Sequence, residues 1–178
     1  MSLLLVESTV PPATERRDHL DAIAGAATAA GADFVEAQVT ADDQVFAIVD
    51  LLQAPRQGVL DALADAGVQV TDSADVRLVG ADLETIKATR PGGEYLVEWD
   101  IPAGITMETY LARKAEKSPL YAQVPEAQFL RTYVREDLVK CLCFYDGEDE
   151  EAVRRAREVV STPVDRLHTL AQGVRSGS

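Results

Sequence analysis

The segment Leu4–Pro11 reads LLVESTVP, and the segment Tyr95–Pro102 reads YLVEWDIP. Leucine, valine and glutamate follow one another in both, ending at Glu7 and Glu98, and an aliphatic residue followed by proline closes each segment. Apolar residues recur in strands by chance, whereas glutamate and proline at matching strand positions indicate an internal repeat. We therefore expect two diverged copies of one unit in this chain.

The pattern around each segment predicts the same order of elements, strand–helix–strand–strand–helix–strand. In the first copy we expect strands at 3–9, 34–39 and 45–51, short closing strands at 68–70 and 76–79, and helices at 15–30 and 55–66. In the second copy we expect strands at 94–101, 128–134, 139–145 and 166–170, and helices at 107–117 and 150–160. The predicted domains are repeat 1 at 1–80, a linker at 81–93, repeat 2 at 94–171 and a frayed tail at 172–178.

A βαββαβ unit of this kind folds as a ferredoxin-like, four-stranded antiparallel sheet with two helices on one face. The other face still carries apolar side chains such as Leu3, Leu5 and Phe129, which should not remain in water. Two such sheets can cover each other. The sequence therefore predicts an α+β fold in which tandem ferredoxin-like repeats pack as a pseudo-dimeric α/β barrel with a central cavity, either as a monomer or as a further homodimer.

The composition and charge of the chain exclude some classes of binding partner. The formal net charge is −13 and the pI about 4.5, so a phosphate backbone would be repelled and nucleic acid is not expected as a partner. No apolar run reaches the ~20 residues needed to cross a bilayer, and residues 1–6 do not resemble a signal peptide. We expect a cytoplasmic protein without membrane contact. Its two cysteines, Cys141 and Cys143, should be free thiols.

Alternation along the strands assigns side chains to the two faces of each sheet. The cavity face should carry two groups of polar side chains. From the first repeat these are Glu7, Glu36 and Gln38, and from the second Glu98, Arg131 and Tyr133. Phe129 precedes Arg131 by two residues and is expected on the same face of the sheet. Cys141 and Cys143 can also lie on this cavity face. His19 lies beside Arg16 and Arg17 on the first helix and is expected in solvent.

These side chains suit two kinds of chemistry. In an enzyme, Glu98 or Tyr133 would act as acid or base, and Arg131 would stabilise an anion. In a metal site, Cys143, Cys141, Glu98 and His168 would be the ligands of a soft transition metal. The alternatives are structural: carboxylates paired with arginines, and buried thiols that only fill the core. With two histidines in the chain, a three-histidine centre is excluded, and no glycine-rich phosphate loop or zinc-protease helix is present.

Residues from Glu94 to Leu170 resemble a family of small ferredoxin-like bacterial proteins of unknown function that are described as nickel-binding. The resemblance rests on ordered matches, which are Tyr95 to Glu98, Tyr133-Val134, Lys140 to Cys143, Tyr145, Glu150 to Arg154 and Pro163 to Arg166. It implies a dimeric α/β barrel in which Glu98, Tyr133 and Cys143 carry over as site positions better than nickel itself does. The expected cofactor is nickel or another divalent transition metal, and the alternative is none. The family often has a histidine on its last helix where this chain has Ala156, which weakens that metal site.

The sequence thus favours a binding protein for a divalent transition metal or a small acidic ligand, held in the central cavity between the sheets. The alternative is a cofactor-independent enzyme of the dimeric α/β-barrel type, a cyclase, isomerase or monooxygenase, that uses Glu98, Tyr133 and Arg131. A third possibility is a structural module with a filled, dry core.

Overall fold

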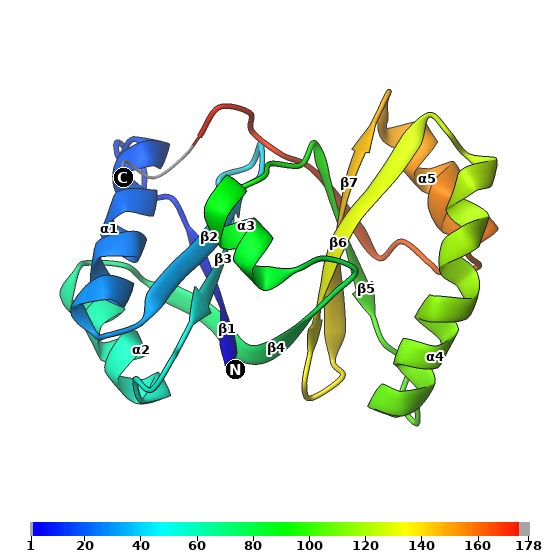
Figure 1. Ribbon diagram of the computed structural model, residues 1–178. Helices are drawn as coiled ribbons and strands as arrows, with labels where there is room; N and C mark the ends of the chain where they lie inside the picture. Colours follow the sequence, from blue (N-terminus) through cyan, green and yellow to red (C-terminus); the bar gives the residue numbers. More distant parts are fainter. Residues whose placement is uncertain (1, 175–178) are drawn as a thin grey trace. The chain divides into compact units, whose positions relative to one another are not determined.

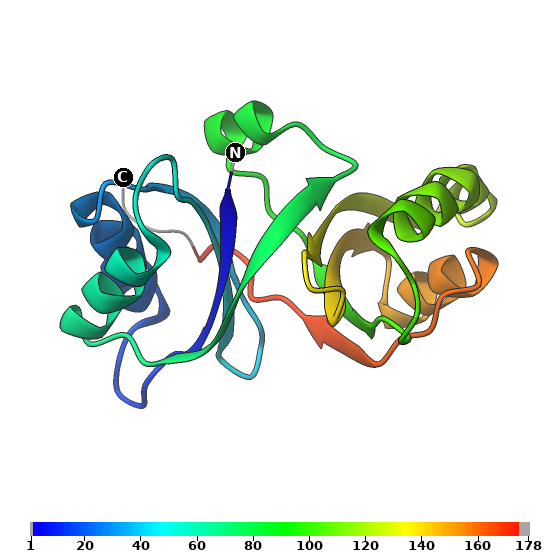
Figure 2. The ribbon, with the colours of Figure 1, turned by 90° about the horizontal axis from the view of Figure 1, so that it is seen from below.

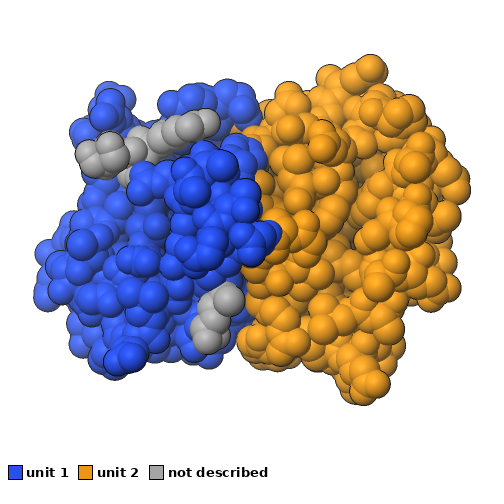
Figure 3. Space-filling model, viewed as in Figure 1, with its two compact units in different colours: residues 1–76, 82–92, 171–178 blue, residues 77–81, 93–170 orange. Residues whose placement is uncertain are grey.

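A computed structural model describes residues 2–174, and the chain forms two compact units (Figure 3). Unit 1 comprises residues 1–76, 82–92 and 171–178, and unit 2 comprises residues 77–81 and 93–170. The segment predicted as a linker belongs largely to unit 1, where it forms helix α3, Leu83–Thr89. Asp82 caps this helix by accepting a hydrogen bond from Thr85 N at 3.0 Å.

Unit 1 has one antiparallel sheet with the strand order β2-β3-β1-β4 (Figure 1). Its further elements are β1 (Leu3–Thr9), α1 (Arg16–Ala29), β2 (Asp33–Val39), β3 (Gln44–Asp50), α2 (Arg56–Asp65) and β4 (Val70–Val79). The two short closing strands expected from the sequence are one continuous strand, β4. Helices α1 and α2 pack on one face of the sheet, against Leu4 and Val6 of β1.

Unit 2 has the strand order β6-β7-β5-β8, and the end of β4 lies beside β6. Its elements are β5 (Tyr95–Asp100), α4 (Met107–Lys117), the 3-10 helix η1 (Ser118–Gln123), β6 (Ala127–Arg135), β7 (Lys140–Gly147), α5 (Glu150–Val159) and β8 (Arg166–Thr169). In both units the first strand lies between the third and the fourth, and the second strand follows the third. This is the ferredoxin-like topology, and the predicted α+β class is confirmed.

Helices α4 and α5 lie side by side over one face of the unit 2 strands (Figure 2). Thr106 caps α4 by accepting a hydrogen bond from Thr109 N at 3.1 Å, and Asp149 caps α5 by accepting one from Ala152 N at 2.8 Å. The apolar side chains beneath the helices include Val97, Val153 and Ala156. This helix-facing side of the sheet, rather than its opposite side, contains the pocket described below.

A β-bulge interrupts the second strand of each unit, between Phe34 and Glu36 in β2 and between Phe129 and Arg131 in β6. A bulge inserts one residue into a strand and so shifts the alternation of side chains. Phe129 therefore packs on the helix-facing side, with its ring parallel to that of Tyr121 at 5.4 Å. The prediction that Phe129 shares a face with Arg131 was wrong for this reason.

The C-terminal segment returns to unit 1, where Ala171 N donates a hydrogen bond to Val39 O at 2.8 Å and Val174 packs against the core. Residues 175–178 of the predicted tail lie outside the described residues. Within residues 2–174, none of the helices combines the length and the apolar character that crossing a membrane requires.

Candidate functional site

Glu98, the most prominent residue of the predicted site, is buried in an ion-pair cluster on β5. Its Oε1 accepts a hydrogen bond from Lys140 Nζ at 2.7 Å, and its Oε2 lies 2.8 Å from Arg166 Nε. The same Oε2 is 2.8 Å from His168 Nε2. Two strands supply these partners because β7 and β8 flank β5, which places Lys140 on one side of Glu98 and Arg166 with His168 on the other.

Burial alone would raise the pKa of Glu98, but the hydrogen bonds from His168, Lys140 and Arg166 outweigh it and lower this pKa to about 2. The carboxylate is therefore ionised at neutral pH, with both oxygens occupied. A carboxylate of this kind is a poor proton acceptor, because a general base works best when its pKa lies near the working pH. The geometry favours an organising role for Glu98 over the acid–base role.

Arg131 and Tyr133, the other two residues of the predicted enzyme site, lie on the same face of the sheet as Glu98. Leu142 is the strand neighbour of both Glu98 and Tyr133. The guanidinium of Arg131 lies 4.8 Å from the centre of the Phe144 ring, and the ring of Tyr133 meets Phe144 edge to face. Both side chains are fully buried. That they line a ligand cavity and act as catalytic groups stays a prediction.

The predicted residues of unit 1 lie on the face of its sheet that points away from α1 and α2. Gln38 Nε2 donates to Glu36 Oε1 at 3.2 Å and to Pro91 O at 3.4 Å. Glu36 is buried, and Glu7 lies on β1 opposite Phe46. That these side chains join those of unit 2 around one ligand cavity stays a prediction.

The two cysteines lie on the other side of the unit 2 sheet from Glu98. Cys143 pairs with Val97 and Cys141 with Trp99, and all four side chains pack beneath α4 and α5. The prediction that Cys141 and Cys143 share a face with Glu98 was wrong. Leu142 and Phe144 on the other face of β7 are as apolar as the cysteines, so alternation among these four residues does not indicate which face meets the helices. Across the described part of the chain, no group of three or more His, Cys, Asp or Glu is placed to hold a metal ion. Cys143, Cys141, Glu98 and His168 therefore do not fit one metal.

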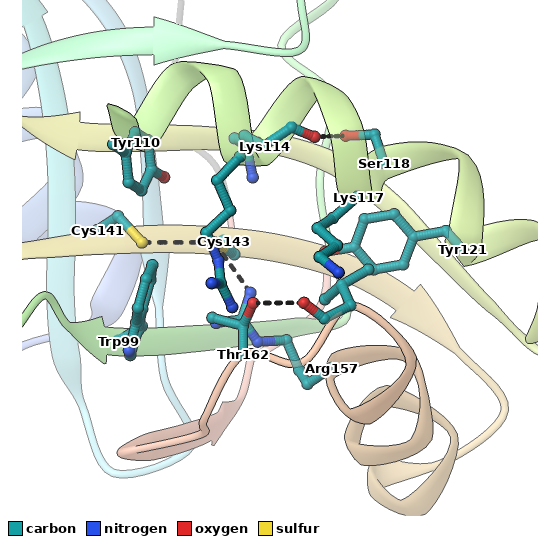
Figure 4. A pocket seen from close by; sticks show the side chains of 12 residues that line it. Trp99, Tyr110, Lys114, Lys117, Ser118, Tyr121, Cys141, Cys143, Arg157 and Thr162 are labelled. Carbon is teal, nitrogen blue, oxygen red and sulfur yellow. Dashed lines mark hydrogen bonds between the residues drawn. The ribbon is translucent and has the colours of Figure 1, made fainter. Parts of the chain in front are cut away.

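The cysteines instead line a pocket inside unit 2 that the sequence did not predict (Figure 4). The cavity has a volume of about 30 Å³ and lies between α4, the strands β5 and β7, and the end of α5. Its lining residues are Trp99, Tyr110, Arg113, Lys114, Lys117, Ser118, Tyr121, Cys141, Cys143, Arg157, Val160 and Thr162. We refer to it as the thiol pocket.

The thiol pocket is strongly cationic. Its lining contains Arg113, Lys114, Lys117 and Arg157, and no aspartate or glutamate is among the described residues that line it. Three of these cations come from one helix, α4, whereas the whole chain has a formal net charge of −13. Cations gathered in a concave site raise the local concentration of anions. The pocket therefore attracts anions although the protein as a whole repels them.

Arg157 is the most deeply buried of these four cations. It is 2% exposed, and its Nη2 donates to Pro163 O at 3.1 Å while its Nη1 donates to Tyr145 Oη at 3.2 Å. Tyr145 Oη in turn lies 2.7 Å from Tyr121 Oη. Arg157 Nε has no hydrogen-bond partner among the described residues. A buried N–H donor without a partner is costly.

The two thiols behave as a pair, with their Sγ atoms 3.8 Å apart. Cys143 Sγ accepts hydrogen bonds from Thr132 Oγ1 at 3.3 Å and from Arg157 Nη1 at 3.6 Å. The hydrogen bond from Cys141, and then the charges of Lys114 and Arg157, hold the pKa of Cys143 well below its usual value, against the effect of burial. The pKa of Cys141 is raised by the same contact and by burial. Cys143 therefore carries the negative charge and Cys141 the proton. Neither cysteine forms a disulfide, as predicted.

Comparisons with known proteins support the fold and part of the family resemblance. Residues 95–170 match the model of the SCO4226-like family, described as nickel responsive protein SCO4226-like. The crystal structure of SCO4226 from Streptomyces coelicolor A3(2) is similar to this chain at 17% identity, over 43% of this chain and 93% of that one, with a TM-score of 0.38. No curated protein matches the chain.

Two further solved structures are similar over both units. "Putative Chlorite dismutase TA0507" covers 97% of this chain, with 96% of its own chain matched, at 10% identity and a TM-score of 0.57. "Putative monooxygenase (FN1347)" from Fusobacterium nucleatum subsp. nucleatum ATCC 25586 covers 95%, with 90% of its own chain matched, at 10% identity and a TM-score of 0.47. The first of these shows the fold alone. The chain thus has the ferredoxin-like α+β fold class predicted from its sequence, and residues 95–170 resemble the SCO4226-like family.

Proposed function

We propose that unit 2 is a binding module for a small acidic ligand, which it holds in the thiol pocket. The observation that supports this proposal is the charge of the lining, with four cations against the one negative charge of Cys143 in a chain of net charge −13. An anion seated there would balance part of the positive charge of the lining and could accept charge-assisted hydrogen bonds from it. The site differs from the central cavity expected from the sequence, while the class of ligand is one of the two expected.

The size of the pocket limits the charged group. One water needs about 10–15 Å³ of such space, so a cavity of about 30 Å³ suits a carboxylate and not a nucleotide phosphate chain. A larger, open groove of about 450 Å³ shares Ser118 and Tyr121 with the pocket and is otherwise lined by mostly apolar residues, including Phe129. The two volumes together fit a carboxylic acid with an apolar or aromatic body.

Benzoate is a direct probe of this proposal, because Trp99 is the only tryptophan of the chain and lines the pocket. We expect a saturable change of Trp99 fluorescence on titration with benzoate. Replacing both partly exposed lysines, Lys114→Gln with Lys117→Gln, should weaken binding roughly fivefold, from about 0.5 kcal/mol for each charge. The affinity should also fall as salt is added, because the lysines are partly screened.

Arg17→Gln is the matched control, since it removes one positive charge from an exposed position on α1 in unit 1. Its benzoate affinity should equal that of the unmodified protein. The proposal is wrong if benzoate gives no saturable response, or if the double lysine variant binds it as tightly as the control.

A soft metal ion is the second candidate, favoured by the separation of the two thiols. Two thiolates bound at about 2.3 Å to a tetrahedral ion lie roughly 3.8 Å apart, which is the separation of Cys141 and Cys143 Sγ. The family matched by residues 95–170 is described as nickel responsive. Against it, the described chain supplies no third ligand, and Arg157 and Lys114 repel a cation.

A titration with Ni²⁺ and Zn²⁺, followed by thiolate-to-nickel absorption and by competition with a chelator, tests the metal candidate. We expect no stoichiometric binding by the cysteine pair, for the reason of charge given above. One ion bound per chain, and lost in Cys143→Ser, would show that the pocket holds a metal and not an acidic ligand.

A further inference from the structure

The groups around Cys143 are typical of a reactive cysteine, and the binding of an anion in the pocket does not explain them. A hydroxyl, that of Thr132, and a guanidinium, that of Arg157, both donate to its Sγ. We propose that Cys143 is an oxidation site, at which a small hydroperoxide that enters the thiol pocket converts its sulfur to the sulfenic acid. This activity does not depend on the acidic ligand proposed above.

The step is a two-electron transfer. Cys143 Sγ attacks one oxygen of the hydroperoxide, the S–O bond forms and the O–O bond breaks, and the electron pair leaves with the second oxygen as alkoxide or hydroxide. Cys141, which keeps its proton 3.8 Å away, can protonate the departing oxygen. Sulfur is oxidised and the peroxide is reduced, so no further reagent is needed for this step.

Arg157 supplies the second observation that points to a ligand at this sulfur. Its side chain is 2% exposed and lines the cavity, and its Nε has no hydrogen-bond partner among the described residues. A guanidinium there can donate to the peroxide and stabilise the negative charge on the departing oxygen. The cavity of about 30 Å³ admits a molecule of the size of hydrogen peroxide.

Cys141 is a natural comparison for Cys143. It lies two residues away on β7, is equally buried and lines the same pocket. It has a hydrogen bond with Tyr110 in place of those that Thr132 and Arg157 donate to Cys143, and it holds the proton of the pair. Because the thiolate and not the thiol is the nucleophile, the two sulfurs should differ in reactivity although they share one environment.

The reaction should depend less on pH than that of an ordinary thiol. A free cysteine gains thiolate roughly tenfold per pH unit below its pKa of about 8.5, whereas the pKa of Cys143 already lies well below its usual value. Titratable or charged groups face Cys143 from three helices and from its own strand. They are Tyr110 and Lys114 of α4, Tyr121 of η1, Arg157 of α5, and Cys141 and Tyr145 of β7. The tyrosines have raised pKa values, chiefly through burial, so none of them titrates near neutral pH.

The test uses the full chain, hydrogen peroxide as oxidant and dimedone, which captures sulfenic acids, with the modified residue identified by fragmentation mass spectrometry. We expect Cys143 to be labelled at least about tenfold faster than Cys141, since only a few per cent of an ordinary thiol is ionised at pH 7. Thr132→Val should slow labelling severalfold, and Thr132→Ser, which keeps the hydroxyl, should restore it.

Two results would overturn the proposal. One is labelling of Cys141 at a rate equal to or above that of Cys143. The other is the absence of label from both residues under conditions that oxidise free glutathione. Benzoate binding is measured separately by Trp99 fluorescence, so failure of this proposal and failure of the acidic-ligand proposal are distinguishable.

Discussion

Replacing Glu98 by glutamine is expected to destabilise unit 2 by about 3–5 kcal/mol, the usual cost of removing one partner from a buried ion pair. The side chain of Glu98 is 4% exposed, and those of its partners Lys140 and His168 are 11% and 12% exposed. Glutamine keeps the size but not the charge, so the cations around it would lose the carboxylate that balances them. Urea unfolding followed by the fluorescence of Trp99, which lies in unit 2, measures the loss.

Asp100→Asn is the matched control, because Asp100 also pairs with Arg166 but has a side chain that is 53% exposed. Exposed ion pairs contribute little, so we expect a loss below about 1 kcal/mol. Equal losses in the two variants would show that burial of Glu98 does not matter to its contribution.

The pH dependence of stability gives a second readout for Glu98. Its pKa is about 2 in the folded protein, against 4.5 for an unperturbed glutamate. The ionised form is therefore favoured by folding: its contribution is fully present above pH 4.5 and is lost as the pH falls from 4.5 towards 2. Glu98→Gln should flatten the stability curve in this window.

The sequence predicted the fold because two kinds of information agreed. The order of elements around Glu7 and Glu98 defined a βαββαβ unit twice, and alternation on β5 placed Glu98 opposite Val97 and Trp99, as the structure has it. Strands with one polar and one apolar row carry this information in their period of two. That the first half is a diverged copy of the second stays a prediction, supported by the equivalent bulges in β2 and β6.

Where a strand or helix lacked such contrast, the sequence predicted less. The alternate residues of β7, Leu142 and Phe144 on one face and Cys141 and Cys143 on the other, are all buried, so nothing in their order indicates which face meets the helices. His19 shows the converse. Because Arg16 and Arg17 are its neighbours, the side chain of His19 was predicted to lie in solvent. That prediction was wrong: the side chain is 4% exposed, and its Nε2 lies 3.0 Å from Ser8 Oγ.

The thiol pocket escaped prediction because it is assembled from elements distant in sequence. Two features of the sequence could have indicated it. Arg157 interrupts the buried side of α5 that Ala152, Val153 and Ala156 otherwise form, and a buried arginine requires partners or a ligand. Arg113, Lys114 and Lys117 gather on one helix of an acidic chain. Either feature indicates a site lined by cations. Only the packing of α4 beside α5 shows that Arg157 and the cations of α4 line the same pocket.

Replacing Gly80 by alanine should destabilise unit 2 by about 2–5 kcal/mol, for two reasons that add. Gly80 has a φ of +87°, a conformation that costs an L-residue about 1–2 kcal/mol. A Cβ at this position would also lie 2.9 Å from Phe129 Cε1. The Phe129 ring is held by Tyr121 and Tyr145, so it has little freedom to move, and overpacking of this kind costs about 1–3 kcal/mol.

Gly104→Ala separates the two contributions. Gly104 also belongs to unit 2 and has a φ of +89°, but a Cβ there would meet no atom within 4 Å. It should therefore show the backbone cost alone, about 1–2 kcal/mol, and the difference between the variants in urea unfolding is the cost of displacing Phe129.

Because Phe129 packs beneath Lys114, with Nζ 4.4 Å from the ring centre, Gly80→Ala should also weaken benzoate binding while Gly104→Ala leaves it unchanged. Identical stabilities for the two variants would mean that the aromatic group around Phe129 yields freely, and that the thiol pocket is less rigid than its packing indicates.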